Sequence, residues 1–216
     1  MTKGSKTLPY EDLSGMFEQI KKAINSNNKR KYIYAYWDKL DAFNHKYGVG
    51  YKESEKHFKE IEKNLKKFIN DITNTDTALI IVSDHGFVNT PFEKIIKLED
   101  NPKMKECFTL PLCGERRTAF CYVHPLKAKQ FETYVMKNLD RYCELYKSQD
   151  LINKNFFGLF EANLNLFDRV GDYILILKEN YIIRDEITEK EKRFSIGHHG
   201  GISKEEMLVP LIFIKK

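Results

Sequence analysis

The sequence predicts an α/β fold, and three observations support this prediction. Segments with apolar residues at helical spacing alternate with short runs of apolar, aromatic and β-branched residues along the 216-residue chain. Hydrophobic residues make up 42% of the chain, which is enough to bury a sizeable core. Acidic and histidine side chains follow two of the apolar runs, where the strand ends of an α/β sheet form binding sites.

The first third of the chain predicts two helices and two strands in alternation. Apolar residues at helical spacing predict a helix over 13–24, and the aromatic run "KYIYAYW" predicts a strand over 31–37. An apolar stripe opposite lysines and glutamates predicts a second helix over 54–72, followed by the strand "ALIIVS" at 78–83. Strand, helix and strand in this order predict a parallel βαβ unit.

The middle of the chain has a different pattern, which predicts an α+β lobe. A strand is expected over 117–123, and apolar positions from Phe131 to Tyr146 then predict a helix of about five turns. The stretch "DYILILKENYII" (172–183) predicts two strands around a Lys-Glu-Asn turn, and "MLVPLIFI" (207–214) predicts a last strand.

These patterns suggest a division into two parts. We expect residues 1–89 and 191–216 to form an α/β core that carries a site, and residues 90–190 to form an inserted lobe on the substrate side.

Composition excludes several classes of protein. No apolar run reaches the about 18 residues that cross a membrane, and no secretion signal opens the chain. The four cysteines have no metal-binding spacing, so we expect reduced thiols in a cytoplasmic protein without a membrane partner. The net charge of +5 is spread along the chain, which disfavours nucleic acid as a partner.

Three short motifs carry candidate ligands. Asp84 and His85 follow the strand at 78–83, while Asp41 and His45 are four residues apart and would share a helix face. "GHHGG" adds His198 and His199 before the last strand. Carboxylates and imidazoles together suit zinc, manganese or iron. Each motif alone also fits a polar surface or a capped turn, but the three together favour a metal site.

The same stretches resemble a known family. "YAYWDKLDAFNHKYG", "IIVSDHGF" and "GHHGGISKEEMLVP" resemble the alkaline phosphatase superfamily, in its type I phosphodiesterase/nucleotide pyrophosphatase branch. The resemblance implies an α/β/α sandwich that binds two divalent metal ions, Zn or Mn. It implies that Asp41, His45 and His199 bind one ion, that Asp84 and His85 bind the other, and that the substrate is a phosphate ester.

The resemblance also implies a Ser or Thr nucleophile and a further aspartate on strands near the N-terminus. Here Thr2, Ser5 and Thr7 precede the first helix, but no apolar strand leads to them. We therefore expect the chain to be a C-terminal fragment whose partner is the missing N-terminal half of the same enzyme. Alone it would be inactive or incomplete.

Two functions remain open from the sequence. One is a metal-dependent hydrolase of phosphoric esters, of phosphodiesterase/nucleotide pyrophosphatase type; the other is a non-catalytic metal-binding or interaction domain of the same fold. Arg116, Arg117 and Arg169 are candidates for binding a substrate phosphate, although surface positions or ion pairs also explain them. His57 and His124 are interpreted as structural.

Overall fold

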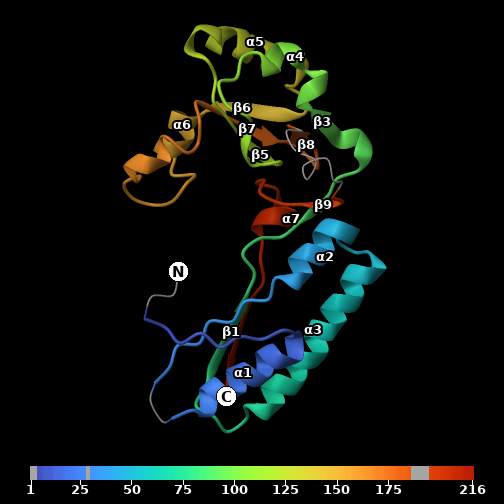
Figure 1. Cartoon of the computed structure of the whole chain (residues 1–216), viewed down its shortest axis with the longest axis vertical. Helices are drawn as coiled ribbons and strands as arrows, with labels where there is room; N and C mark the ends of the chain where they lie inside the picture. The colour runs from blue at the N-terminus through green and yellow to red at the C-terminus, as the bar shows by residue number, and fades with distance from the viewer. Residues whose placement is uncertain (1–3, 28–29, 186–194) are drawn as a thin grey trace. The chain divides into compact units, whose positions relative to one another are not determined.

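The computed structural model describes residues 4–27, 30–185 and 195–216 (Figure 1). The chain divides into two compact units, which we describe separately. The terminal unit consists of Met1–Ser83 with Pro210–Lys216, and the central unit consists of Asp84–Val209. None of the helices in the described part of the chain is long and apolar enough to cross a membrane.

The terminal unit is built from three helices and a pair of strands. Its elements are α1 (Leu13–Asn25), α2 (Lys39–Tyr47), α3 (Lys52–Asp71), β1 (Ala78–Val82) and β10 (Leu211–Lys215). Asp12 caps α1 by accepting a 2.7 Å hydrogen bond from the Gly15 N–H. The rings of Phe17 on α1 and Phe68 on α3 lie 5.0 Å apart, so the apolar faces of these helices pack together. The predicted helices over 13–24 and 54–72 are confirmed within one or two residues.

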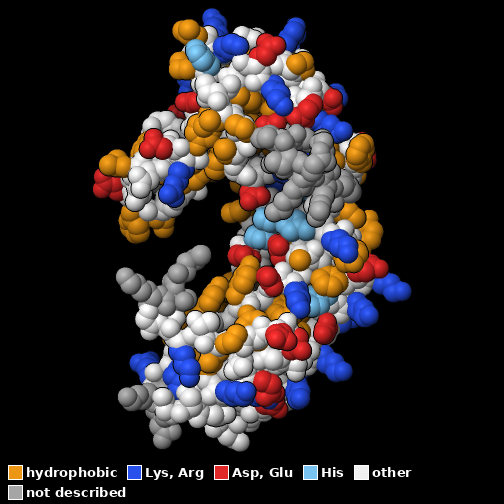
Figure 2. All heavy atoms as spheres, in the orientation of Figure 1, with side chains coloured by type: hydrophobic (Ala, Val, Ile, Leu, Met, Phe, Trp, Pro, Cys, Tyr) orange, Lys and Arg blue, Asp and Glu red, His pale blue; other side chains and the backbone are white. Residues whose placement is uncertain are grey.

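The strands β1 and β10 pair antiparallel, with Ile80 opposite Phe213. The predicted parallel βαβ unit is therefore wrong, because β1 pairs with the C-terminal strand and not with residues 31–37. One face of this pair is exposed: Ile80, Val82, Leu211 and Phe213 are 61%, 61%, 76% and 64% exposed. Figure 2 shows hydrophobic side chains at the surface of the terminal unit.

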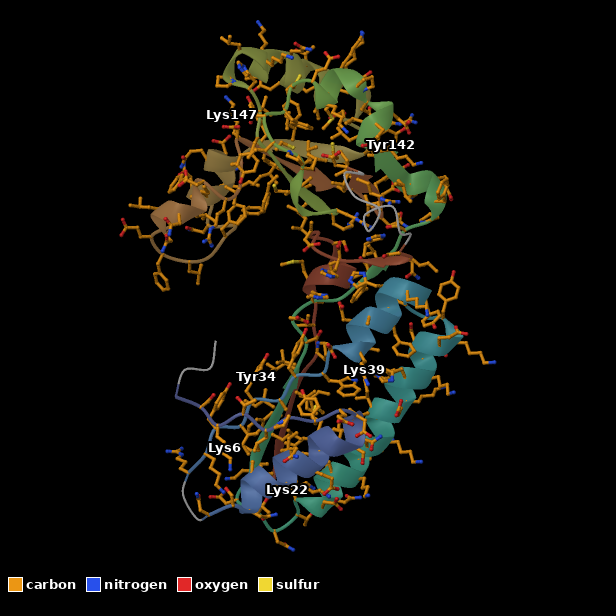
Figure 3. All side chains as sticks on the ribbon, in the orientation of Figure 1. Lys6, Lys22, Tyr34, Lys39, Tyr142 and Lys147 are labelled. Carbon is orange, nitrogen blue, oxygen red and sulfur yellow. The ribbon has the colours of Figure 1, made fainter. Side chains whose placement is uncertain are left out.

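Residues 31–37 do not form a strand. Tyr32 and Tyr34 are 91% and 72% exposed, and none of the described strands pairs with this segment. Tyr34 is labelled on it in Figure 3. Aromatic residues favour a strand only where a neighbouring strand can pair with the backbone N–H and C=O groups. None of the described strands pairs with residues 31–37, so the composition alone was misleading here.

The central unit contains a four-stranded antiparallel sheet and shorter pairings. Its elements in chain order are β2 (Val88–Asn89), η1 (Phe92–Lys94), β3 (Ile95–Lys97), η2 (Leu98–Asp100), α4 (Pro102–Lys105), β4 (Cys113–Glu115), β5 (Thr118–Cys121), η3 (Pro125–Lys127), α5 (Ala128–Asn138), β6 (Cys143–Lys147), α6 (Ser148–Asn153), η4 (Leu164–Leu166), β7 (Tyr173–Leu177), β8 (Ile182–Arg184), β9 (Gly197–His198) and α7 (Lys204–Met207). The sheet has the order β4-β5-β7-β6; β3 and β8 pair in parallel, and β2 pairs with β9.

Strand β7 organises the core because all five of its residues are buried. Leu175 and Leu177 point into one apolar cluster with Phe131 and other residues of α5. Ile174 and Ile176 alternate to the other face and pack with Leu151 and other residues of α6. The continuous apolar run "YILIL" thus reflects burial on both faces of the sheet.

One prediction in this region is wrong and another is confirmed. The helix expected through Tyr146 ends at Asn138, because residues 143–147 form β6 and pair with β7. The apolar residues of 143–147 fit the helical spacing by coincidence. The hydrogen bonds between β6 and β7 determine the structure of this segment instead. The two strands expected over 172–183 are present as β7 and β8; β7 pairs with β5, and β8 pairs with β3.

The unit boundaries differ from the division that the sequence suggested. The units separate at Ser83/Asp84 and at Val209/Pro210, whereas the sequence placed the boundaries at 89/90 and 190/191. Asp84, His85 and His199 therefore belong to the central unit and Asp41 and His45 to the terminal unit. The proposed division into a metal-binding core and a substrate lobe stays a prediction.

Candidate functional site

The terminal unit carries Asp41 and His45 on α2. They are one turn apart on the same helix face, with His45 Nε2 3.6 Å from Asp41 Oδ1. Both side chains are about one-third exposed, at 38% for Asp41 and 34% for His45. The pair therefore presents a carboxylate and an imidazole together at the surface of its unit.

Helix α2 is fixed beneath this pair by an aromatic stack. The ring of Phe43 on α2 stacks on His57 of α3 at 4.7 Å, with 10° between the ring planes. His57 is buried and its Nε2 accepts a 3.0 Å hydrogen bond from Trp37 Nε1. His57 thus has a structural role, as its sequence position indicated. At the end of the helix, the Ser54 hydroxyl donates to Gly48 O at 2.8 Å.

The central unit begins with Asp84 and His85, directly after β1. The Asp84 side chain is 61% exposed and that of His85 is 25% exposed. His85 Nδ1 donates to Gly86 O at 3.1 Å, which makes Nε2 the acceptor nitrogen of the neutral ring. His85 Nε2 lies 3.8 Å from Asp84 Oδ1.

His199 lies directly on His85. The two imidazole rings stack at 3.7 Å with 16° between their planes, and one nitrogen of each lies within 4.8 Å of the other. Phe87 packs beside both rings, at 5.2 Å from His85 and 5.1 Å from His199. The stack therefore brings two imidazole rings, a common kind of metal ligand, to one place in the central unit.

The neighbouring His198 is directed elsewhere. It is 4% exposed, and its Nε2 donates to Ser195 O at 2.9 Å. His198 lies on β9 opposite Val88 of β2, and successive strand residues point to opposite sides. Of the two adjacent histidines, the structure brings His199 to His85.

Glycines allow the chain segments to approach closely at this site. A Cβ on Gly86 would lie 2.0 Å from the backbone O of Glu205. Gly200 has φ +93°, and its Cβ would meet the side chain of Glu115 at 2.5 Å. Only glycine fits at these positions, one residue after His85 and one after His199.

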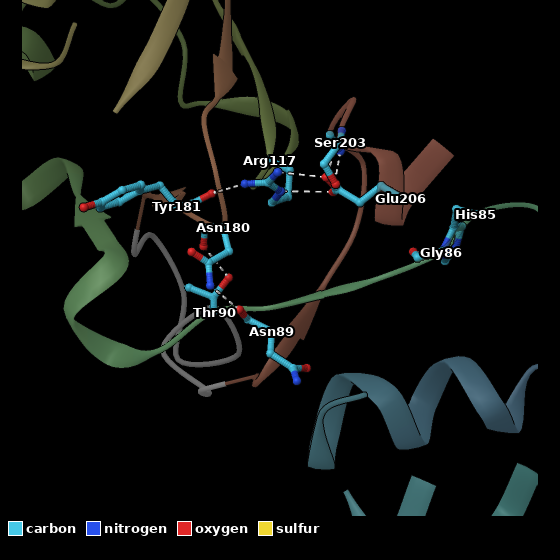
Figure 4. Close-up of polar contacts among 10 residues, drawn as sticks. His85, Gly86, Asn89, Thr90, Arg117, Asn180, Tyr181, Ser203 and Glu206 are labelled. Carbon is cyan, nitrogen blue, oxygen red and sulfur yellow. Dashed lines mark hydrogen bonds and ion pairs between the residues drawn. The ribbon is translucent and has the colours of Figure 1, made fainter. Parts of the chain in front are cut away.

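Arg117 and Glu206 form a buried ion pair in the central unit (Figure 4). Arg117 and Glu206 are each 1% exposed, and the guanidinium binds both carboxylate oxygens, at 3.0 and 2.8 Å. Burial raises the pKa of Glu206, but hydrogen bonds from Arg117 and Ser203 outweigh it, so the pKa lies below its ordinary value. The sequence interpretation missed this role of Glu206; its signal was Ser203 three residues ahead, a capping-box pattern.

The candidate arginines have different surroundings. Arg117 was considered for substrate binding, but its guanidinium is buried against Glu206 and the carbonyl of Tyr181, so that assignment needs correction. Arg116 is half-buried and Arg169 is exposed. A role for these two in binding substrate stays a prediction.

The profile of the family described as type I phosphodiesterase/nucleotide pyrophosphatase matches residues 5–202. The chain belongs to this phosphodiesterase family. The matched range includes all five predicted ligands, namely Asp41, His45, Asp84, His85 and His199. It ends before Glu206, so the ion-pair partner of Arg117 lies outside the match.

One curated protein and several solved structures are also similar to this phosphodiesterase-family chain. The human bis(5'-adenosyl)-triphosphatase ENPP4 is 24% identical over 186 residues, which cover 82% of this chain and 36% of that protein. Murine ENPP5, an ectonucleotide pyrophosphatase/phosphodiesterase, matches with TM-score 0.72 and 19% identity, covering 95% of this chain and 54% of that one. Phosphonoacetate hydrolase from Sinorhizobium meliloti 1021 matches with TM-score 0.55 and 18% identity over 80% of this chain and 43% of that one.

These matches show a mixed α/β, alkaline phosphatase-like fold, which confirms the predicted fold class and family. The chain of this phosphodiesterase-family protein spans about half the length of the ENPP5 structure and about one third of ENPP4. The layering as an α/β/α sandwich stays a prediction.

Proposed function

We propose that this chain is the metal-binding part of a metal-dependent hydrolase of phosphoric esters, of phosphodiesterase/nucleotide pyrophosphatase type. The observation that supports it most is the stack of His85 on His199, with Asp84 beside His85, inside the range matched by the family. Residues 114 positions apart in the chain meet there through their rings, as 199 − 85 = 114.

The residues fit two divalent cations by their chemistry. Under this proposal Asp41, His45 and His199 bind one ion and Asp84 and His85 bind the other. Imidazole nitrogens and carboxylate oxygens suit Zn or Mn. His85 supports the assignment, since the bond from its Nδ1 to Gly86 O directs Nε2 to act as the ligand atom.

When bound, paired cations would stabilise the charge on the attacking and leaving oxygens of a displacement at phosphorus. The contribution of the chain is then to hold the ligands. Phe87 packs beside both stacked rings, and α2 presents Asp41 and His45 on a single face. The proposal assigns no nucleophile to this chain, so we expect it to turn over phosphodiesters slowly or not at all.

The substrate class follows from the names of the similar proteins. One is a bis(5'-adenosyl)-triphosphatase, and an inactive ENPP5 structure contains AMP. We propose a nucleotide-type phosphate ester for this chain too. A cytoplasmic location also stays a prediction; the four free cysteines, three of them buried, support it.

We propose that the exposed face of β1 and β10 binds the polypeptide that completes the family fold. Ile80, Val82, Leu211 and Phe213 leave an apolar face uncovered, which a soluble monomer rarely keeps. The ENPP5 chain is nearly twice as long as its match to this chain, which supports more chain as the occupant. Hydrogen exchange at β1 and β10, on the protein purified from its native cells and on this chain alone, tests it. Equal exchange in both would refute this partner.

The alternative is a non-catalytic metal-binding or interaction domain of the same fold. It is favoured by the short span of the match to ENPP4 and by the exposed apolar face. It shares the metal site with the first proposal but predicts no turnover, even when the complete protein is assayed.

Metal titration tests the shared part of both proposals. Calorimetry with Zn²⁺ and with Mn²⁺ should show binding to the purified chain, and Asp41→Ala combined with His199→Ala should weaken it at least about 10-fold. His124→Ala is the matched control, because His124 caps a 3-10 turn away from these residues in the sequence. Unchanged affinity in the double variant would refute the ligand assignment. Turnover of an aryl phosphodiester by the complete protein then separates hydrolase from binding domain.

A further inference from the structure

We infer that Glu206, oriented by Arg117, is a positioning residue for the metal ligands His85 and His199. This inference rests on the proposed function, since it concerns the same site. Glu206 contacts the two loops that carry these histidines, and it does so with different groups: its carboxylate holds one loop and its backbone carbonyl holds the other.

The carboxylate holds the loop that follows His199. Oε1 accepts from the Gly201 N–H at 2.8 Å, and Oε2 lies 3.4 Å from the Ser203 N–H. Gly201 is suited to this contact because a Cβ there would lie 2.6 Å from Glu206 Oε2. The bonded amide belongs to Gly201, two positions after His199, so the position of the carboxylate limits where the His199 ring can lie.

The backbone of Glu206 holds the segment that carries His85. Its carbonyl O accepts from the Gly86 N–H at 2.8 Å. A second tie between the two segments comes from β2 and β9, where Val88 pairs with His198. Displacing Glu206 would therefore affect both rings of the stack, and the 3.7 Å separation between them would change.

Arg117 sets the direction of the carboxylate. It lies in the turn between β4 and β5, and its Nη1 donates to Tyr181 O at 2.6 Å. The backbone O of Arg117 also accepts from the Leu177 N–H at 2.9 Å, which ties this turn to β7 in the core. A planar guanidinium with two bonds to a carboxylate fixes its orientation as well as its place.

A buried ion pair by itself is weak support for a role in stability. Replacing both partners by apolar residues of similar volume is often neutral, because the desolvation of two charges offsets their attraction. Such a replacement would leave the Gly201 amide without its acceptor while the core stays filled. Stability and ligand geometry can thus be separated by experiment.

The test compares the wild type with Arg117→Met/Glu206→Leu. Zn²⁺ affinity is measured by calorimetry, the ligand field by the visible absorption of bound Co²⁺, and folding by thermal unfolding. We expect a melting temperature near that of the wild type, an affinity at least about 10-fold lower, and an altered Co²⁺ spectrum. Val135→Ala is the control: Val135 is 1% exposed in α5, so its loss lowers stability and should leave affinity and spectrum unchanged.

Each outcome decides between the two proposals. If the wild type binds neither Zn²⁺ nor Co²⁺, the proposed function fails. If the wild type binds and the double variant binds equally with the same spectrum, Glu206 does not position the ligands. Should the double variant fail to fold, Glu206→Asp replaces it, since a shorter carboxylate cannot reach both Arg117 and Gly201. If Glu206→Asp then binds Zn²⁺ as tightly as Val135→Ala does, at equal stability, the inference is overturned.

Discussion

Gly86 shows how this site depends on the absence of a Cβ atom at one position. The amide of Gly86 binds Glu206 O, and the carbonyl of Glu205 occupies the space of a Cβ. A backbone atom cannot move away as the end of a flexible side chain can. The position of His85 therefore depends on a neighbour that has no chemical function of its own.

Replacing Gly86 by alanine should separate the two loops. The Cβ would lie 2.0 Å from Glu205 O, so the backbone must shift and the bond from Gly86 N to Glu206 O is lost. We expect a loss of about 2 kcal/mol or more in the free energy of unfolding and weaker Zn²⁺ binding. Chemical denaturation and calorimetry measure both. Gly50→Ala has backbone strain from φ +80° but meets open space, so it should leave Zn²⁺ binding intact.

Acid should remove the contribution of Glu206. Its pKa in the folded protein lies below the ordinary value of 4.5, because hydrogen bonds from Arg117 and Ser203 outweigh the effect of burial. A lowered folded pKa gives stability that is fully present above about pH 4.5 and is lost as the pH falls through the folded pKa. The free energy of unfolding of the wild type and of Glu206→Gln is measured against pH. The wild type should be the more stable protein at neutral pH, and the difference in free energy should become smaller in acid. A constant difference would contradict this assignment.

At the scale of the elements, α2 matters because it is short and has no buried residue. Nine residues form a marginal helix in isolation, so packing must hold it. The Phe43 ring stacked on His57 supplies that packing, and it lies between Asp41 and His45 in the sequence. The presentation of both ligands depends on this contact with α3.

Removing the Phe43 ring should loosen α2. Phe43→Ala loses the stack on His57, for which we expect a cost of about 1–3 kcal/mol in the free energy of unfolding, below that of a fully buried phenylalanine. Zn²⁺ affinity should fall with it, since Asp41 and His45 lose their common support. Phe58→Ala is the control because Phe58 is 58% exposed on α3, and we expect little change there. Equal effects of the two variants would contradict a supporting role for Phe43.

The exposed face of β1 and β10 should tolerate polar residues. Phe213→Thr removes a ring that is 64% exposed, so stability should change by less than about 0.5 kcal/mol, while binding of a hydrophobic dye should decrease. Ile81→Thr is the matched variant, because Ile81 points to the opposite, less exposed face of β1 and should cost more. Denaturant unfolding and dye fluorescence distinguish the two faces.

The elements show where sequence patterns carry information. Helices α1 and α3 are long and strongly periodic, so their pattern predicted them well. Residues 31–37 and 143–147 were misassigned because a strand is defined by its partner. Residues 31–37 pair with none of the described strands, and residues 143–147 pair with β7, which lies further along the chain. Pairing of β1 with β10 could not be read from local pattern for the same reason, since Ala78 and its partner Lys215 are 137 positions apart in the chain, as 215 − 78 = 137.

The whole molecule divides into two compact units, and the candidate ligands are divided between them. The motifs predicted which residues would be ligands, because Asp-x-x-x-His and Asp-His-Gly are short and local. Glu206 and Arg117 are 89 residues apart, so their pairing required the fold. The ligand assignment from the motifs stays a prediction, and the structure adds the contacts that Glu206 makes around these residues.

Metal binding should couple the unfolding of the two units. Without metal we expect two thermal transitions, because each unit has its own packing. If Asp41 and His45 bind the same ion as His199, Zn²⁺ should raise the lower transition and bring the two together. Differential scanning calorimetry measures this, and Asp41→Ala/His45→Ala should abolish the convergence without removing either transition. Convergence that persists in this variant would contradict shared ligation.

Trp37 gives the protein a built-in optical reporter for such experiments. It is the only tryptophan in the chain, and it belongs to the terminal unit, where its indole donates to His57 beneath α2. Its emission therefore follows the surroundings of one unit, while circular dichroism averages over the helices of both. A fluorescence melt compared with a dichroism melt would identify which unit unfolds first, with no label attached.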